Sequence, residues 1–410
     1  MATKNKSAVR VWYASAVYGK EEIAAVTAVL SNPLKIGPGE KVKKFERSVA
    51  KLFGKAHGIM VNSGSSANLL AIEALDLPAG SEVVTPVLTF STTLAPLLQK
   101  GLTPVFVDVV PGTYVIDADK VERAITRKTR ALMIPSLLGN IPDLAKLQKI
   151  AKKHKLFFIE DSCDTINATF AGRPTGSYTD ITTTSFYASH IITAAGSGGM
   201  VSVNDPKMAR TILVKSSWGR DSTLFGVYEK SEDITKRFAG FIGAQPYDAK
   251  FIFSEVGYNL QSGELNAAFG LEQLKRLKLF SARRRSNFKR LSSFFRRYEK
   301  FFILPVQDPR VATNWLAFPL TIRPDAPFSR KDITLYLEKC NIQTRPIFTG
   351  NVLRQPAFRS LSKGTKAGSF PVADDVMKNG FVIGCHHGLT GADLDYLEST
   401  LSDFLRSYLS

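Results

Sequence analysis

The chain has 410 residues, a formal net charge of +18 and 44% hydrophobic residues, which is typical of a globular protein large enough for two domains. No apolar run approaches the ~20 residues of a membrane span, and the first residues lack the apolar core of a signal peptide, so we expect a cytoplasmic protein that does not bind membranes. The basic residues are spread along the chain without a nucleic-acid-binding motif, which argues against a nucleic-acid partner.

The first part of the chain predicts helices, a strand and a small-residue turn. Apolar positions recur at helical or strand spacing, and the turn at residues 62–68 follows the strand directly. A strand, a small-residue turn and a helix N-terminus together favour an anion site, because unpaired backbone N–H groups and the helix dipole converge there. The expected elements are helices over 18–30 and 42–53, a strand at 59–61 and a helix over 69–77.

Short apolar strands then alternate with helices, which predicts βαβ units and a mainly parallel sheet covered on both faces. Ligands of such sheets bind beyond the carboxyl ends of the strands. Phe90, Asp161, Ser185 and His190 all follow expected strand ends. The expected strands begin at 82, 104, 130, 156, 180 and 200, with helices over 118–126 and 141–153.

The last part of the chain predicts an irregular excursion at 226–250, a long helix from 264 to about 302 and a small α/β unit. The small unit has a strand at 315–322 and helices over 330–340 and 393–408. We therefore expect a large domain over residues 1–275 and a small C-terminal domain over 276–410. His386 and His387 are adjacent, so they point to opposite sides and predict no metal site by themselves.

Residues 183–190 and the glycine turn at 196–199 carry a resemblance to a known family. A Ser-Phe pair, a lysine four residues beyond the Phe and a glycine-rich turn are similar to the cofactor-anchoring segment of nucleotide-sugar aminotransferases. These are fold-type I pyridoxal-phosphate (PLP) enzymes with a large mainly parallel sheet domain and a small C-terminal α/β domain. In this chain His190 stands at the lysine position, and imidazole forms no stable Schiff base with an aldehyde.

The histidine is typical of one branch of that family, the 3-dehydratases of 4-keto-6-deoxy sugars. The resemblance implies that pyridoxamine phosphate (PMP) is held without a covalent bond and that His190 acts as the base. A lone histidine is more often structural, but Ser185 and the glycine turn favour the functional interpretation. The resemblance also implies cofactor contacts from Gly64, Ser65, Ser66, Phe90, Asp161, Asp164 and Ser185.

Two further motifs refine the resemblance. Some relatives hold an iron–sulfur cluster that begins at the position of Cys163 and continues after a Trp-Gly-Arg-Asp motif, here 218–221. No cysteine follows that motif before Cys340, and one thiolate cannot hold a cluster, so we expect the cluster-free branch and no metal. Arg220 of the motif is a candidate fork for a substrate phosphate or carboxylate. Asn259 matches a residue that reaches the cofactor of the neighbouring subunit, which implies a homodimer.

The resemblance thus predicts a 3-dehydratase of O-antigen-type deoxysugar biosynthesis. Its substrate would be a nucleotide-diphosphate 4-keto-6-deoxyhexose, and L-glutamate would convert PLP to PMP. Two alternatives stay open: a transaminase that recruits another lysine, such as Lys215 or Lys250, and a catalytically silent relative. One departure is Ser197, which stands where the family usually has a glutamate.

Overall fold

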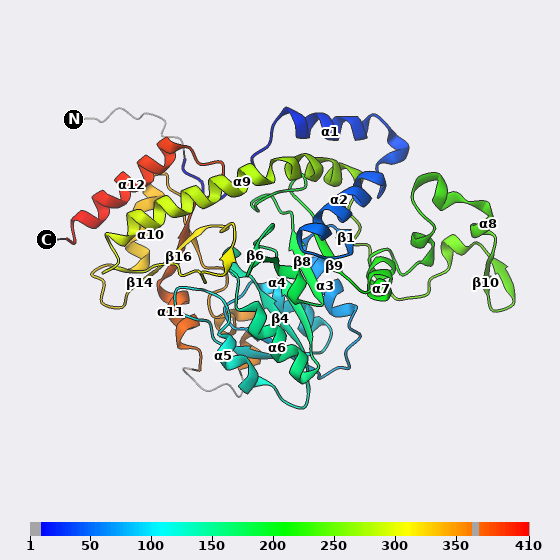
Figure 1. The fold of residues 1–410 in the computed structure, drawn as a ribbon, viewed down its shortest axis with the longest axis horizontal. Helices are drawn as coiled ribbons and strands as arrows, with labels where there is room; N and C mark the ends of the chain where they lie inside the picture. Colours follow the sequence, from blue (N-terminus) through cyan, green and yellow to red (C-terminus); the bar gives the residue numbers. More distant parts are fainter. Residues whose placement is uncertain (1–9, 363–368, 410) are drawn as a thin grey trace.

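A computed structural model describes residues 10–362 and 369–409, and a seven-stranded sheet forms its centre (Figure 1). Only β9 runs against the others, as it pairs antiparallel with both neighbours, so the predicted mainly parallel sheet is confirmed. In spatial order the strands are β1 (His57–Val61), β9 (Gly199–Val203), β8 (Ile181–Ser185), β5 (Phe157–Asp161), β4 (Thr129–Pro135), β2 (Glu82–Pro86) and β3 (Thr103–Val107).

Both faces of this sheet are buried. Adjacent residues of β2, Val83 and Val84, belong to two different hydrophobic clusters, and so do Leu132 and Met133 of β4. Since successive side chains of a strand point to opposite faces, helices must cover each side. These helices are α2 (Glu40–Leu52), α3 (Gly64–Glu73), α4 (Ser91–Gln99), α5 (Ala118–Val121), α6 (Leu144–His154) and α7 (Pro206–Ser216).

The C-terminal part of the chain forms a second, antiparallel sheet with its own helices, reached through the long helix α9 (Glu264–Arg296) (Figure 1). The N-terminal segment lies against it, since Val11 pairs with Ile342. The proposed boundary near residue 275 falls inside α9 and stays a prediction. The elements are β12 (Phe302–Ile303), β14 (Phe318–Ile322), β16 (Gly380–Ile383), β15 (Arg345–Pro346), α10 (Arg330–Lys339), α11 (Pro371–Asn379) and α12 (Gly391–Arg406).

The remaining elements are an N-terminal helix, a small sheet and a protruding segment. Helix α1 (Lys20–Leu30) lies along α9, and a three-stranded sheet joins β13 (Val311–Ala312), β6 (Thr169–Phe170) and β7 (Arg173–Pro174). Residues 226–253, which we call the arm, stand away from the body at the right of Figure 1. The arm contains α8 (Ile234–Arg237), β10 (Gly240–Ile242) and β11 (Gln245–Tyr247).

Several expected elements differ from the structure, among them the helix expected over 118–126, whose α-helical part ends at Val121. The arm is not irregular, because β10 and β11 form a hairpin. Helix α3 begins at Gly64 rather than at residue 69, since the Ser63 hydroxyl accepts a hydrogen bond from the Ser66 N–H and starts the helix in the turn itself. Helix α9 ends at Arg296 instead of residue 302.

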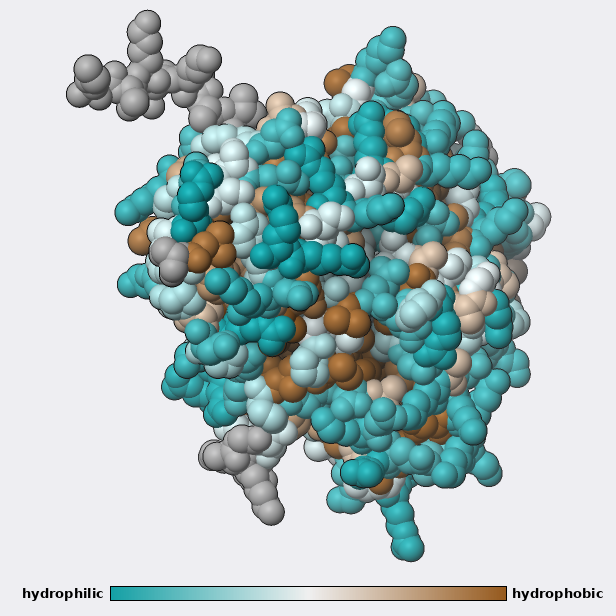
Figure 2. All heavy atoms as spheres, turned by 60° about the vertical axis from the view of Figure 1, so that its left-hand side comes forward, coloured by the Kyte–Doolittle hydropathy of each residue, from teal (hydrophilic) through white to brown (hydrophobic). Residues whose placement is uncertain are grey.

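The surface is mixed in character. The face drawn in Figure 2 is largely hydrophilic, with hydrophobic atoms gathered in a hollow near its lower centre. Among the described helices, none is long and apolar enough to cross a membrane.

Candidate active site

A cavity of about 460 Å³ brings together most of the predicted site residues. It lies beyond the carboxyl ends of β5 and β8, which is where ligands of parallel sheets bind. Three further predicted residues, Ser66, Arg220 and Asn259, do not line it. The predicted residues in its wall are Gly64, Ser65, Phe90, Asp161, Asp164, Ser185 and His190.

The turn before α3 forms one end of the cavity. Its backbone is held tightly, because a Cβ atom on Gly64 would lie 2.7 Å from both Cys163 Sγ and Ser185 Cβ. Ser66 does not face the cavity, since its hydroxyl donates to Asn62 Oδ1 at 2.6 Å. The first N–H groups of a helix are not used within the helix, so this helix start at Gly64 and Ser65 can bind an anion.

The glycine turn after His190 packs directly against the turn before α3. A Cβ atom on Gly199 would lie 2.2 Å from the Ser63 carbonyl oxygen, so only glycine fits there. The Ser197 hydroxyl donates to the Asn62 carbonyl at 2.6 Å. The serine that replaces the usual glutamate therefore joins the two turns.

Asp161, at the end of β5, is fixed by three donors. Its carboxylate accepts hydrogen bonds from Asn68 Nδ2 at 2.8 Å, the Thr93 hydroxyl at 2.7 Å and the Cys163 N–H at 3.1 Å. Thr183 donates to Asn68 Oδ1 at 2.6 Å, which turns the amide nitrogen of Asn68 toward Asp161. Asp161 is only 5% exposed, so its carboxylate has one orientation in the wall of the cavity.

Two of those supporting residues were missed in the sequence. Asn68 lies at the end of the small-residue turn at 62–68, within α3, and Thr93 lies in the first turn of α4, just beyond the end of β2. One sequence feature could have identified them, because both are polar residues that follow closely after the end of an expected strand. Only the tertiary structure brings the two turns to the same carboxylate.

His190 lies in the wall of the cavity without a hydrogen-bond partner for its buried Nδ1 atom. Burial, the largest effect, and the positive charge of Arg284 together lower the pKa of His190 to about 4, against the opposing effects of the Cys163 backbone and of Asp161. The ring of Tyr187 meets it edge-on, with centroids 6.1 Å apart. The imidazole is thus neutral near pH 7 and able to accept a proton.

Asp164 has the opposite shift. Burial raises the pKa of Asp164 to about 7, and the negative charge of Asp161 adds to the rise. The Leu138 N–H donates to its carboxylate at 2.8 Å. The two carboxyl groups in this wall therefore differ in their surroundings. Asp161 is held by side-chain donors, whereas Asp164 can gain or lose a proton near neutral pH.

Phe90 presents an aromatic surface to the cavity and is 47% exposed. Its ring is held by Phe348, which meets it edge-on at a centroid distance of 5.7 Å. The loop that carries Phe348 is attached to the end of β2, because Thr349 donates to the Thr89 carbonyl at 2.6 Å and the Val352 N–H donates to Val87. The sequence analysis missed Phe348, since nothing near it in the chain predicts this contact.

Arg220 and Asn259 lie outside this cavity. The guanidinium of Arg220 stacks on the Trp218 ring at 4.3 Å, and its backbone pairs with Phe253. Asn259 is exposed and pairs with Ser217. Neither residue contacts the cavity of its own chain, so their predicted roles stay predictions.

No lysine is found among the residues lining the cavity. Lys215 lies 3.4 Å from Glu73 and 3.7 Å from Glu255, and it is held there by both carboxylates. Lys250 pairs with Glu232. Neither candidate of the lysine-recruiting alternative lines the cavity in this structure.

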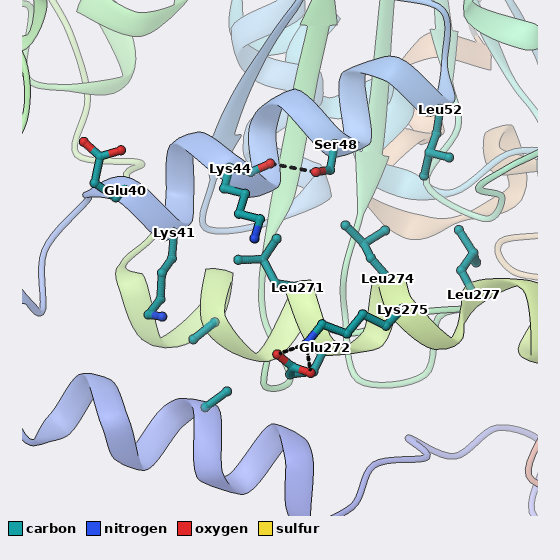
Figure 3. Close-up of a pocket in the computed structure, with 12 residues that line it drawn as sticks. Glu40, Lys41, Lys44, Ser48, Leu52, Leu271, Glu272, Leu274, Lys275 and Leu277 are labelled. Atoms are coloured by element: carbon teal, nitrogen blue, oxygen red, sulfur yellow. Dashed lines mark hydrogen bonds and ion pairs between the residues drawn. The ribbon is translucent and has the colours of Figure 1, made fainter.

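A larger groove of about 590 Å³ lies between α2 and α9, with α1 at its edge (Figure 3). Leu271 and Leu274 of α9 point toward α2, while Lys275 turns aside and pairs with Glu272 at 2.6 Å. None of the predicted site residues lines this groove. The smaller cavity is the candidate active site because convergent polar groups with shifted pKa values line it.

Residues 17–402 match the DegT/DnrJ/EryC1/StrS aminotransferase family. The chain is 39% identical over 397 residues to the dTDP-4-dehydro-2,6-dideoxy-D-glucose 3-dehydratase of Saccharopolyspora spinosa, covering 94% of this chain and 84% of that protein. It is 32% identical over 395 residues to the GDP-4-keto-6-deoxy-D-mannose 3-dehydratase of Escherichia coli O55:H7, covering 95% of this chain and 98% of that protein.

Solved structures agree with this assignment. The E. coli GDP-4-keto-6-deoxy-D-mannose-3-dehydratase with bound hydrated PLP superposes with a TM-score of 0.82 at 29% identity, covering 96% of this chain and all of that one. The same fold recurs in GDP-4-keto-6-deoxymannose-3-dehydratase with a trapped PLP–glutamate geminal diamine, with a TM-score of 0.83, 29% identity and coverage of 95% and 100%. The expected resemblance to sugar 3-dehydratases is confirmed, and the chain belongs to the DegT/DnrJ/EryC1/StrS aminotransferase family.

Proposed function

We propose that this protein is a PLP/PMP-dependent 3-dehydratase of a nucleotide-linked 4-keto-6-deoxyhexose, with L-glutamate as the amino donor. The observation that carries the proposal is a neutral histidine in a cavity that has no lysine in its wall and that also contains a fixed carboxylate, Asp161. Relatives named as 3-dehydratases of dTDP- and GDP-linked sugars support the reaction. Because these relatives use different nucleotides, we propose the 3-dehydration reaction and do not assign the nucleotide of the substrate.

The residues of the cavity fit the cofactor. The helix start at Gly64 and Ser65 offers N–H groups to a phosphate, and any side chain at Gly64 would fill that space. Phe90 offers an aromatic face for stacking on the pyridine ring. Asp161 would keep a proton on the ring nitrogen, and Asp164, which lines the same cavity, would meet the ring hydroxyl.

When bound, the cofactor supplies an amine that condenses with the C4 ketone of the sugar and a ring that takes up electrons. His190 accepts the proton from the carbon that bears the amine, because its imidazole is neutral and its buried Nδ1 has no other partner. The side chains of Phe90 and Phe348 cover one side of the cavity and limit the entry of water. The C3 hydroxyl group would leave as water, and the proton it gains balances the proton that His190 takes up.

The silent-relative alternative is less well supported. The Asp161 carboxylate accepts hydrogen bonds from Asn68 and Thr93, and Thr183 in turn donates to Asn68. Stability alone does not require this arrangement. Buried polar networks of this kind are costly unless every member is satisfied. The measurement of PLP and PMP binding described below distinguishes a silent relative from an active enzyme.

We also propose that the chain forms a homodimer through the arm. Large apolar side chains are concentrated there and lie open to solvent, with Phe238 69% exposed and Ile234 67% exposed. Contiguous exposed apolar surface of this kind marks a protein interface. Asn259 is exposed near the base of the arm, which fits a role toward a second copy. The other exposed apolar residues are Phe241, Ile242, Tyr247, Phe251 and Phe253.

The first prediction concerns the pH dependence of stability. Burial lowers the pKa of His190 to about 4, whereas an unfolded histidine has a pKa of about 6.5. Between these values the unfolded chain binds a proton that the folded chain does not, so the free energy of unfolding falls as the pH falls. As the pH falls from about 6.5 to about 4, we expect the free energy of unfolding of the wild type to decrease relative to that of His190→Asn, which has no imidazole at this position.

Urea unfolding of both proteins across this pH range measures the effect. His57→Asn, at an exposed position in β1, is the matched control and should not reproduce it. A difference between wild type and His190→Asn that stays constant with pH would show that His190 is not shielded from water.

The second prediction is that the cofactor binds without a covalent bond. With no lysine in the wall of the cavity, the cofactor should be released in full on denaturation, as PLP from the untreated complex and as its alcohol, pyridoxine phosphate, when the complex is first treated with borohydride. Mass spectrometry of the tryptic peptides checks this outcome. A pyridoxyl group on Lys215 or Lys250 would establish the transaminase alternative, and failure to bind PLP or PMP at all would favour the silent relative.

The third prediction is that His190→Asn loses 3-deoxygenation by at least about 10²-fold, the lower range for a positioned base. Product analysis with a 4-keto-6-deoxy nucleotide sugar and glutamate is the assay. Retained PMP binding, measured by absorbance, shows that the cavity is intact. Undiminished 3-deoxy product would remove His190 from the mechanism.

The fourth prediction is that polar substitutions on the arm weaken the dimer. Phe238→Ser combined with Phe241→Ser removes two exposed rings from the proposed interface, so the dimer dissociation constant should rise at least about 10-fold. Sedimentation velocity measures it. Leu335→Ser, at a side chain 48% exposed on α10, is the matched control. An unchanged dimer in the double variant would place the interface elsewhere.

A further inference from the structure

Thr183 has a fully buried hydroxyl group in the middle of β8. The hydroxyl lies 2.6 Å from Asn68 Oδ1 and 3.4 Å from the Glu160 carbonyl oxygen. A hydroxyl has one proton to donate, and the shorter contact takes it, so Thr183 donates to Asn68. Thr183 is not one of the residues that line the cavity of the active site, whereas Asn68 is.

The amide of Asn68 links Thr183 to Asp161. Its Oδ1 accepts from Thr183, while its Nδ2 donates to Asp161 Oδ2 at 2.8 Å and to the Thr92 carbonyl at 3.2 Å. The reverse orientation of the amide would bring Oδ1 against two acceptors, so it is excluded. The oxygen and both N–H bonds of this buried amide are therefore used, and Thr183 supplies the donor for the oxygen.

The donors are distributed unequally over the two oxygens of Asp161. Oδ2 accepts from Asn68 at 2.8 Å and from the Thr93 hydroxyl at 2.7 Å, which uses both of its lone pairs. Oδ1 accepts the Cys163 N–H at 3.1 Å, and the Cys163 thiol beside this carboxylate is a weak donor. A protonated ring nitrogen is a much stronger donor than a thiol, so Oδ1 is the oxygen available to a ligand in the cavity.

Asn68 has a second place to go, because it lines the cavity. A buried amide oxygen without a donor is costly, so the loss of the Thr183 hydroxyl would favour rotation of Asn68 into the cavity, where water can donate to its oxygen. That rotation would remove one of the two side-chain donors from Asp161 Oδ2. The carboxylate would then be free to turn, and Oδ1 would lose its fixed direction.

We propose that Thr183 is a positioning residue, which acts through Asn68 to present Asp161 Oδ1 to the ring nitrogen of the cofactor. The inference rests on the cofactor part of the proposed function and is independent of the sugar reaction. Because Thr183 does not line the cavity, it touches neither cofactor nor substrate. Its effect is transmitted by two consecutive hydrogen bonds, of 2.6 Å to Asn68 and of 2.8 Å from Asn68 to Asp161.

Two compounds test this role without an activity assay. PLP and its 1-deaza analogue, in which a carbon replaces the ring nitrogen, differ at the atom that Asp161 would meet. Since no lysine lines the cavity, both should bind reversibly to the full chain, and absorbance titration gives their dissociation constants. The wild type should bind PLP more tightly than the analogue. Thr183→Val replaces the hydroxyl by a methyl group of similar size and should reduce this preference about 10-fold, as expected for a hydrogen bond to a charged group.

Two variants of β8 are the matched controls. Thr183→Ser keeps the hydroxyl and should retain the preference for PLP. Thr182→Val removes a buried hydroxyl from the next residue, which points to the opposite face of the strand and bonds to Thr179 at 2.9 Å, so the preference should stay unchanged. An equal loss in Thr182→Val or in Thr183→Ser would show a general loosening of the strand and would overturn the proposal.

The crystal structure of Thr183→Val without cofactor gives a second readout, in which Asn68 Nδ2 should lie beyond hydrogen-bonding distance of Asp161 Oδ2. If this variant does not fold, Asn68→Ala removes the same contact and replaces it in the titration. A wild type without the preference, a preference unchanged in the variant, or an unmoved Asn68 overturns the proposal. A wild type that prefers PLP but forms no 3-deoxy product would reject the proposed reaction and leave the role of Thr183 intact.

Discussion

The hydrogen bonds on the Asp161 carboxylate determine the geometry of the whole cavity. Asp161 ends β5, while its donors Asn68 and Thr93 come from α3 and α4. Each helix begins in a turn at the end of a strand, and those turns also bring Gly64, Ser65 and Phe90 into the wall of the cavity. A carboxylate in a buried position is stable only when its donors are in place, so the three elements can pack in only one way.

The histidine side of the cavity depends on backbone packing rather than on side-chain hydrogen bonds. Gly199 permits the turn after His190 to touch the turn before α3, and Ser197 adds a hydrogen bond between them. His190 itself is held by its position in the wall and not by a partner at Nδ1. In the proposed function His190 accepts a proton, and a ring nitrogen without a partner can do so without first breaking a hydrogen bond.

The C-terminal part of the chain completes the site through one loop. Thr349 and the Val352 N–H attach that loop to the end of β2, and Phe348 is thereby placed against Phe90. Phe348 has a φ of +43°, a strained conformation for a bulky residue. Strain of this kind persists only where the surrounding contacts impose it, and it is common at functional sites. Helix α9, which joins the two parts, keeps a fully buried arginine at its centre.

The sequence by itself determined the mainly parallel sheet, the small-residue turn before α3, and the residues that end β5 and β8. Those features rest on local patterns: apolar runs of strand length, glycines where no Cβ fits, and polar residues immediately after a strand. The tertiary structure alone decided that Asn68, Thr93 and Phe348 join the site, that Ser66 turns away from it, and that Arg220 and Asn259 lie outside the cavity of their own chain. These outcomes depend on contacts between residues far apart in the chain, on which local spacing carries no information.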